Sequence, residues 1–289
     1  MTARWIVGID GSPVAVDAMH WAALHAGDRQ AELVAVSAFQ VPTVLALLTA
    51  KRGFGVDELG LAATAAHDID MAIEQVGGDV APGTVTVQPR VEEGPAAHVL
   101  VDLATEADLL VLGRNGSGEL RNHPVGSVTR YCATHATAPV VVVPDGWTAA
   151  RSELIVVGFD GSPNSADAVA WALEFADAAA TVRIVSAIDV APWLDENLTR
   201  ERFPDEIAAE EARLGELLDV LDPERRAERV VVLHSPRQAL AEAAGTADLI
   251  VVGTRGHGGI AAGLMGSVST WILHGTHAPV VVVPKRRAS

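Results

Sequence analysis

Apolar runs alternate with amphipathic segments along both halves of this 289-residue chain. Residues 109–112 and 249–252 are apolar at every position, which is typical of parallel strands covered by helices on both faces. The pattern therefore predicts an α/β fold with two similar open five-stranded parallel sheets in tandem. In the first half we expect strands near 4–9, 32–38, 84–91, 108–113 and 139–143 and helices near 13–26, 57–77, 95–105 and 126–136; in the second half we expect strands near 153–159, 181–188, 229–234, 248–253 and 279–283.

The motifs also occur twice, which indicates two similar domains. The tetrapeptide Asp-Gly-Ser-Pro stands at 10–13 and again at 160–163, and Ala-Pro followed by four valines occupies 138–143 and 278–283. A chain of this length has room for about two domains of ordinary size. The segment 144–148 carries the proline and glycine expected of a boundary. We expect one domain over residues 1–147 and a second over residues 148–289.

The Asp-Gly-Ser-Pro segments predict how the first helix of each domain begins. Ser12 and Ser162 are candidate N-caps, and the proline that follows each suits the first helical position. This leaves Asp10 and Asp160 at the carboxyl end of the first strand, the edge of an open α/β sheet where ligands bind. Taken singly, each aspartate is also typical of an ordinary turn.

A glycine-rich element follows the fourth predicted strand of each half. Gly113-x2-Gly116-x9-Gly126-Ser127 recurs as Gly253-x2-Gly256-x9-Gly266-Ser267. Glycine lets the backbone pass close to an anion, and the amides at a helix start attract negative charge. A glycine-rich turn would give the same pattern. If the first and fourth strands are neighbours, loop and aspartate converge on one crevice, which suits a nucleotide with its ribose or a divalent ion near the carboxylate.

The composition limits the kinds of partner and the cellular compartment that we expect for this protein. A net charge of −16 argues against nucleic acid, whose phosphates the surface would repel. No segment reads as membrane-spanning, and no signal-like apolar run precedes Asp10. The single cysteine, Cys132, cannot form a disulfide within the chain, which fits a reducing cytoplasm.

The sequence lacks the residues that several classes of enzyme require. The chain's only lysines, Lys51 and Lys285, lie outside the glycine loops, so a Walker-type NTPase or kinase is excluded. The dinucleotide fingerprint after the first strand is missing, and no serine stands in a nucleophile elbow with an evident histidine and acid. His274 and His277 have no nearby cysteine or carboxylate with which to hold a metal. We therefore expect no catalytic residue.

Together, Asp-Gly-Ser, the glycine element and the closing Ala-Pro-Val-Val-Val-Val-Pro resemble the universal stress proteins in their tandem, ATP-binding form, over essentially the whole chain. The resemblance implies Rossmann-like domains of strand order 3-2-1-4-5 that bind ATP, with Mg²⁺ near Asp10 and Asp160, between the first and fourth strands. It assigns the two aspartates to the adenosine, the backbone of Ala38 and Ala187 to adenine, and the remaining residues to ribose and phosphate: Gly113, Gly116, Gly126, Ser127, Gly253, Gly256, Gly266 and Ser267.

The two loops differ in their variable part. The second carries the apolar Leu264-Met265 usual for the family, whereas the first carries residues 121–124, Arg-Asn-His-Pro. We therefore expect the second half to bind ATP more securely. Arg121 is a candidate to bind a terminal phosphate. An ordinary solvent-exposed arginine in the loop would give the same sequence.

Three functions remain open. The favoured one is a cytoplasmic ATP-binding stress-response protein in which occupancy sets conformation or affinity for an unidentified protein partner. The alternatives are a slow ATP hydrolase or adenylyl-transfer relative, and an interaction scaffold that no longer binds nucleotide.

The final strands predict how the protein assembles. The valine runs at 140–143 and 280–283 are final strands that we expect at sheet edges, and an exposed apolar edge must be covered. We expect the two halves to pair these edges and the whole chain to form a homodimer.

Overall fold

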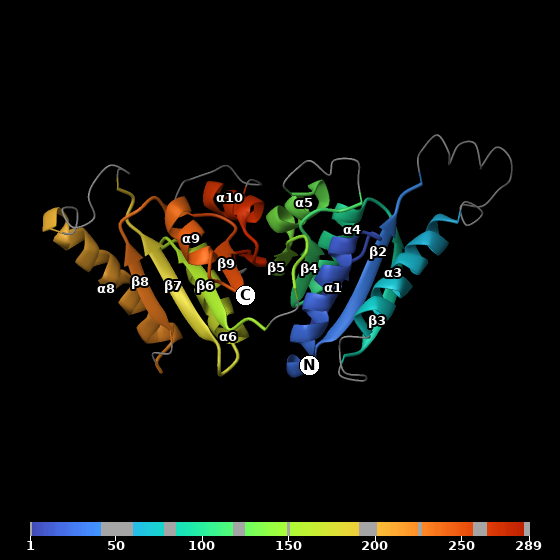
Figure 1. Cartoon of the computed structure of the whole chain (residues 1–289), viewed down its shortest axis with the longest axis horizontal. Coiled ribbons are helices and arrows are strands. Elements are labelled where there is room, and N and C mark those ends of the chain that lie inside the picture. Colours follow the sequence, from blue (N-terminus) through green and yellow to red (C-terminus); the bar gives the residue numbers. More distant parts are fainter. Residues whose placement is uncertain are drawn as a thin grey trace. The chain divides into compact units, whose positions relative to one another are not determined.

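The computed structural model describes residues 2–41, 60–77, 85–117, 125–148, 151–190, 201–224, 227–256 and 265–285. These residues form two compact units, Met1–Ala149 and Ala150–Ser289 (Figure 1). Strands and helices alternate in both units, which confirms the predicted α/β class in tandem.

The first unit has five parallel strands. Its elements are β1 (Arg4–Gly8), α1 (Pro13–Ala26), η1 (Gly27–Arg29), β2 (Glu32–Phe39), α3 (Leu61–Gly77), β3 (Val87–Glu93), α4 (Ala96–Leu103), η3 (Ala104–Glu106), β4 (Leu109–Gly113), α5 (Ser127–His135) and β5 (Val140–Val143). The strands lie in the order β3-β2-β1-β4-β5, so β1 and β4 are neighbours as predicted.

The second unit repeats this topology. Its elements are β6 (Leu154–Phe159), α6 (Pro163–Phe175), β7 (Thr181–Ala187), α8 (Pro204–Leu221), β8 (Glu228–Val232), α9 (Pro236–Ala244), β9 (Leu249–Gly253), α10 (Ser267–Gly275) and β10 (Val280–Val283). All its strands are parallel, in the order β8-β7-β6-β9-β10. In open α/β sheets of this order, ligands bind at the carboxyl ends of the first and fourth strands, where the strand order reverses.

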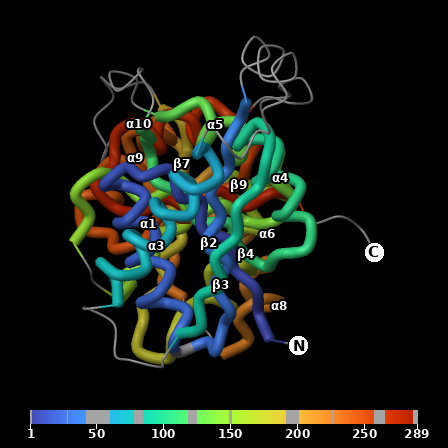
Figure 2. The backbone as a smooth tube through the Cα atoms, turned by 90° about the vertical axis from the view of Figure 1, so that its right-hand side faces the viewer, coloured from blue at the N-terminus to red at the C-terminus, as the bar shows by residue number. Residues whose placement is uncertain are grey.

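Helices cover both faces of each sheet. In the first unit α1 packs beside α3, and α4 packs beside α5; Figure 2 shows α1 and α3 on one side of β2 and β3, with α4 on the other. Every residue of β4 and of β9 is buried, as the continuous apolar runs predict. Trp21 of α1 is fully buried and stacks on Trp5 of β1 at 6.2 Å between ring centroids.

The strand whose bounds differ most from the prediction is the third. The third strand was expected near 84–91, but β3 runs from Val87 to Glu93 because its register with β2 begins at Leu33 opposite Val87. Pro89 stands inside β3 and cannot donate a ladder hydrogen bond. The strand tolerates it because β3 is the last strand of this unit's order on that side.

The chain that leaves β5 folds back on α1. The amide of Gly146 donates to Oδ2 of Asp17 at 3.1 Å, and the Trp147 ring meets His20 edge-on at 6.2 Å. Burial raises the pKa of the Asp17 carboxyl, and the hydrogen bond from Gly146 opposes that rise. Residues 145–147 are therefore held against the first unit.

Within the described ranges, no helix is long and apolar enough to cross a membrane.

Candidate functional site

A cavity of about 480 Å³ opens at the carboxyl ends of β1, β2 and β4 in the first unit. All six residues that the sequence singled out in this half line it: Asp10, Ala38, Gly113, Gly116, Gly126 and Ser127. They come from four separate segments of the chain. The fold therefore brings the predicted first-half residues together.

The loop after β1 is built around a helix cap. Oγ of Ser12 accepts a hydrogen bond from the Ala15 amide at 3.3 Å, and Pro13 opens α1, so the predicted N-cap is confirmed. Gly11 between Asp10 and Ser12 has a φ of 75°, which favours glycine. This turn leaves the Asp10 side chain at the cavity.

The Asp10 carboxylate joins this turn to the glycine loop. Its Oδ1 accepts hydrogen bonds from the Ser12 amide at 3.1 Å and the Ser12 hydroxyl at 2.6 Å. Its Oδ2 accepts one from the Ser117 amide at 2.8 Å. A Cβ added to Gly116 would collide with that same oxygen. A side chain at 116 would therefore require the Asp10 carboxylate to move from its place against the loop backbone.

The remaining glycines allow close backbone contacts. A Cβ on Gly113 would lie 2.9 Å from the Val14 carbonyl oxygen, so the loop passes α1 at the distance that only glycine permits. Gly126 caps α5, and its amide donates to the Arg114 carbonyl at 2.8 Å. Thr129 donates its hydroxyl to the Gly113 carbonyl at 2.8 Å. The first turn of α5 is thereby fastened to the end of β4.

The second unit reproduces this backbone arrangement. Ser162 caps α6, and its amide donates to Oδ1 of Asp160 at 2.9 Å. A Cβ on Gly256 would collide with Oδ2 of Asp160, and a Cβ on Gly253 would lie 2.8 Å from the Asn164 carbonyl oxygen. The Gly266 amide donates to the Thr254 carbonyl at 2.8 Å, Ser267 begins α10, and Ala187 ends β7. Residues 121–124, including Arg121 and His123, and residues 257–264, including His257 and Leu264, lie outside the described residues.

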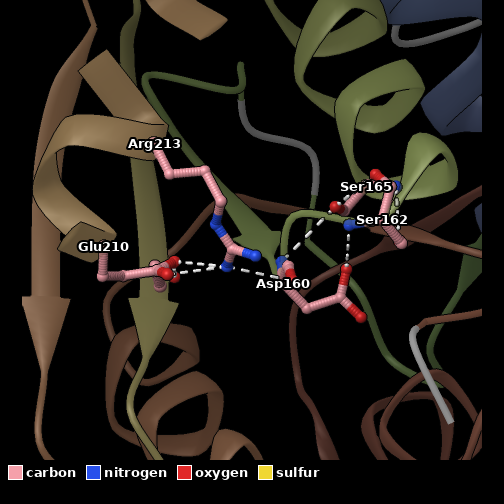
Figure 3. A network of polar contacts seen from close by, with 6 residues as sticks. Asp160, Ser162, Ser165, Glu210 and Arg213 are labelled. Carbon is pink, nitrogen blue, oxygen red and sulfur yellow. Dashed lines mark hydrogen bonds and ion pairs between the residues drawn. The ribbon is translucent and has the colours of Figure 1, made fainter. Parts of the chain in front are cut away.

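Sequence reasoning missed an arginine in the second unit. Arg213 of α8 donates to the Asp160 carbonyl at 3.1 Å and to Glu210 at 2.7 Å (Figure 3). Its guanidinium carbon lies 5.5 Å from the centroid of the Phe159 ring, and the Ser186 hydroxyl donates to Glu210. Figure 3 shows the Asp160 carboxylate turned toward Ser162 and away from Arg213. Arg213 therefore supports the backbone of this turn rather than pairing with the carboxylate.

A second missed contact ties the first glycine loop to the segment after β5. Asp145 accepts hydrogen bonds from Arg114 at 3.4 Å and from Nδ2 of Asn115 at 3.0 Å. The positions that follow β9 and β10 in the second unit hold Thr254, Arg255 and Lys285, none of which is acidic. This contact, called here the Asp145 clamp, belongs to the first unit, and Asn115 also lines the cavity.

The donor set at the aspartates is sparse for a metal. Within the part of the chain that the structure describes, no cluster of three His, Cys, Asp or Glu side chains could hold an ion. Asp10 offers carboxylate oxygens of the kind that Mg²⁺ prefers, but the other ligands of such an ion would come from phosphates and water.

Comparison with known proteins identifies the family. Residues 1–144 and residues 152–284 each match the sequence model of the Universal stress protein family. Universal stress protein Rv2623 of Mycobacterium tuberculosis H37Rv is 31% identical over 297 aligned residues, which cover 96% of this chain and 95% of that protein.

Solved structures agree on the fold. A putative universal stress protein from Pseudomonas aeruginosa UCBPP-PA14 superposes with a TM-score of 0.61 at 16% identity, over 99% of this chain and 94% of that one. A universal stress protein from Archaeoglobus fulgidus DSM 4304 gives a TM-score of 0.60 at 15% identity, over 98% and 96% of the two chains. With two family matches in tandem and near-complete alignment to a relative, this chain belongs to the universal stress protein family.

Proposed function

We propose that the protein is a cytoplasmic stress-response protein that binds ATP and changes conformation or affinity for a partner protein with occupancy. The observation that carries this proposal is the convergence of Asp10, Ala38 and the glycine loop on one cavity. Its volume of about 480 Å³ falls within the range of roughly 300–1,000 Å³ usual for small-molecule sites. The second unit repeats the loop geometry, so we extend the proposal to a second site at Asp160 and Gly256.

The proposed binding mode follows from the loop backbone. The phosphates occupy the amides near Gly116 and Ser127, where glycine admits close approach and the α5 dipole favours negative charge. The adenosine lies toward Asp10 and the Ala38 backbone, and Mg²⁺ accompanies the phosphates beside the Asp10 carboxylate.

Occupancy has a structural consequence in this mode. The Ser117 amide now donates to Asp10. A phosphate that takes this amide displaces the carboxylate or shares the position through Mg²⁺, because two anions repel each other at such a distance. Ligand binding thereby alters the contact between the β1 turn and the glycine loop.

Nucleotide turnover is slow or absent in this proposal. The sequence offers no lysine in either glycine loop, and amides alone stabilise the bound ground state nearly as well as a transition state. We expect less than about 1 s⁻¹, the low end for ordinary enzymes. A faster multiple-turnover release of ADP would favour the alternative of an ATP hydrolase or adenylyl-transfer relative.

The most direct test is to denature the purified full-length protein and identify and count any released nucleotide per chain. Adenine nucleotide at up to two per chain supports the proposal. Calorimetric titration of nucleotide-free protein with ATP, with and without Mg²⁺, then measures each site. Absence of both released nucleotide and binding would leave the interaction scaffold as the better account.

We further propose that the whole chain forms a homodimer. Closed symmetric dimers are the commonest assemblies of soluble proteins. Light scattering of the full-length protein measures the mass directly, and a value of one chain across the accessible concentration range would contradict this part of the proposal.

A further inference from the structure

The cavity in the first unit carries one arginine on its wall. Arg130 lines the cavity together with Asp10, and these two are the charged side chains among the described residues that do so. Arg130 is exposed, and in the described part of the chain its side chain makes no ion pair or hydrogen bond. Arg114, by contrast, is held by Asp145. Among the described residues that line this cavity, Arg130 is therefore the cation that a ligand can engage without breaking an existing pair.

The position of Arg130 is fixed by the first turn of α5. Its backbone amide donates to the Gly126 carbonyl at 2.9 Å, so it stands one turn beyond the helix cap. Residues three and four apart share a helix face, which places Arg130 on the same face as Gly126 and Ser127. Thr129 beside it is tied to the Gly113 carbonyl, so this turn cannot shift independently of the glycine loop.

The second unit has a neutral residue at the matched position. Thr270 follows Ser267 as Arg130 follows Ser127, and its amide donates to the Gly266 carbonyl at 2.9 Å, as the Arg130 amide does to Gly126. The backbones of the two helix starts correspond, but the second lacks the arginine. At this position the first site carries a positive charge and the second site does not.

We propose that Arg130 is a specificity-determining residue of the first site, where it binds the outer phosphates of an adenine nucleotide and makes affinity there depend on phosphate number. This inference rests on the proposed function and deepens it. The guanidinium can form two parallel hydrogen bonds with phosphate oxygens, which strengthens binding of a charged ligand and adds nothing for a neutral nucleoside. It also offsets the repulsion between those phosphates and the Asp10 carboxylate. The second site has Thr270 at the matched position and lacks this contact.

The test uses the full-length chain carrying Gly256→Glu, which removes the second site from the measurement. Adenosine, AMP, ADP and ATP are titrated by calorimetry into this protein and into its Arg130→Gln and Arg130→Lys versions. We expect Arg130→Gln to weaken ATP binding about tenfold while adenosine binding stays within about twofold, since only the charged ligand loses a charge-assisted contact. Arg130→Lys should fall between, and the salt dependence of ATP binding should be shallower in Arg130→Gln.

A gain-of-contact variant provides the matched control. Thr270→Arg in a chain that carries Gly116→Glu should raise the preference of the second site for ATP over adenosine several-fold. Arg130 and Thr270 both lie in the first turn of helices whose starts correspond. We expect Arg130→Gln to leave thermal unfolding unchanged.

The outcomes separate the two proposals. If the unmodified chain binds none of the four ligands, the proposed function fails and this inference fails with it. If the Gly256→Glu chain binds ATP but its Arg130→Gln version binds ATP equally well, or loses adenosine and ATP affinity alike, the inference alone is overturned. A loss confined to the phosphorylated ligands supports it.

Discussion

The two units share a backbone but differ in the charge that lies against it. Gly11 and Gly161 occupy the same turn with φ of 75° and 78°. A Cβ on Gly11 would lie 2.8 Å from a carboxylate oxygen of Asp68 in α3, whereas a Cβ on Gly161 would collide with the guanidinium of Arg213 in α8. The turn has the same conformation in both units, although it lies beside the acidic Asp68 in the first and beside the basic Arg213 in the second. Its geometry is therefore set by glycine and by the Ser12 and Ser162 caps, and the neighbouring charge is free to differ.

The largest expected effect is on the alkylation rate of Cys132, which offers a way to follow the unfolding of each unit separately. Burial raises the pKa of the Cys132 thiol to about 12 from an ordinary value of 9.0. Three pKa units lower the reactive thiolate fraction about a thousandfold at pH 8. We expect alkylation of Cys132 in the folded protein to be slower than in the unfolded chain by at least that factor.

Cys132 is the chain's only cysteine, so its alkylation reports opening of the first unit alone. Ile272, fully buried at the matched position of α10, allows the converse probe. Ile272→Cys combined with Cys132→Ala should report opening of the second unit. Rapid alkylation of native Cys132 would contradict the burial on which this pair of probes depends.

Acidic side chains in the glycine loops should remove one site at a time. Gly116→Glu and Gly256→Glu each place a side chain against the Asp10 or Asp160 carboxylate and a negative charge at the phosphates. We expect more than a hundredfold loss of ATP affinity at the altered site, several kcal/mol by the usual conversion. Calorimetric stoichiometry should fall by one site in each variant.

The loop sequences predict which loss is greater. Because the second loop carries the Leu264-Met265 pair usual for the family, Gly256→Glu should reduce total ATP binding more than Gly116→Glu does. Gly266→Glu and Gly126→Glu form a second matched pair with the same expected order. Unchanged ATP binding in all four variants would show that the site is misplaced.

The contrast between Asp68 and Arg213 can be measured by a double-mutant cycle. Gly161→Ala places an ordinary residue at positive φ and displaces Arg213 from its contacts with Glu210 and the Asp160 carbonyl. We expect a cost of about 1–3 kcal/mol in the free energy of unfolding of the second unit.

In an Arg213→Ala background the same Gly161→Ala change should cost less, because only the backbone penalty remains. Gly11→Ala with and without Asp68→Ala is the matched cycle in the first unit. Denaturant unfolding followed through the two cysteine probes supplies the free energies. Equal costs with and without Arg213 would mean that the arginine does not restrain this turn.

The smallest expected effect concerns the Asp145 clamp. Asp145→Ala removes the contacts with Arg114 and Asn115, but the Asp145 side chain is half exposed, so solvent screening limits the ion pair. We expect the first unit to lose at most about 1 kcal/mol. Lys285→Ala at the matched position should leave the second unit unchanged, and a larger loss from Lys285→Ala than from Asp145→Ala would reverse the comparison.

The sequence predicted the parts of this molecule that depend on local rules. Continuous apolar runs indicated the buried strands β4 and β9, and Asp-Gly-Ser-Pro indicated helices that begin at Pro13 and Pro163. The spacing of the glycines placed a loop between a strand and a helix in each half. These features are set by residues close together in the chain, so they can be read from it.

The contacts that sequence reasoning missed join distant segments through long side chains. Arg213 reaches Asp160 across 53 positions, and Asp145 reaches Asn115 across 30. Arginine and aspartate at such positions read as ordinary surface residues until the fold brings their elements together. The start of β3 was misplaced for a related reason, since the register with β2 fixes where that strand begins.

The Asp145 clamp also decides where the chain can be cut. The sequence predicts that the residues after Val143 only connect the two domains. In the structure, however, Asp145 accepts a hydrogen bond from the glycine loop, Gly146 donates one to Asp17, and the Trp147 ring meets His20 edge-on. A fragment that stops at the end of β5 would leave Arg114 and Asn115 without this acidic partner and would uncover α1. A protease cut or an expression boundary after Trp147 spares every one of these contacts, so the shortest version of the first unit that keeps them extends four residues past its last strand.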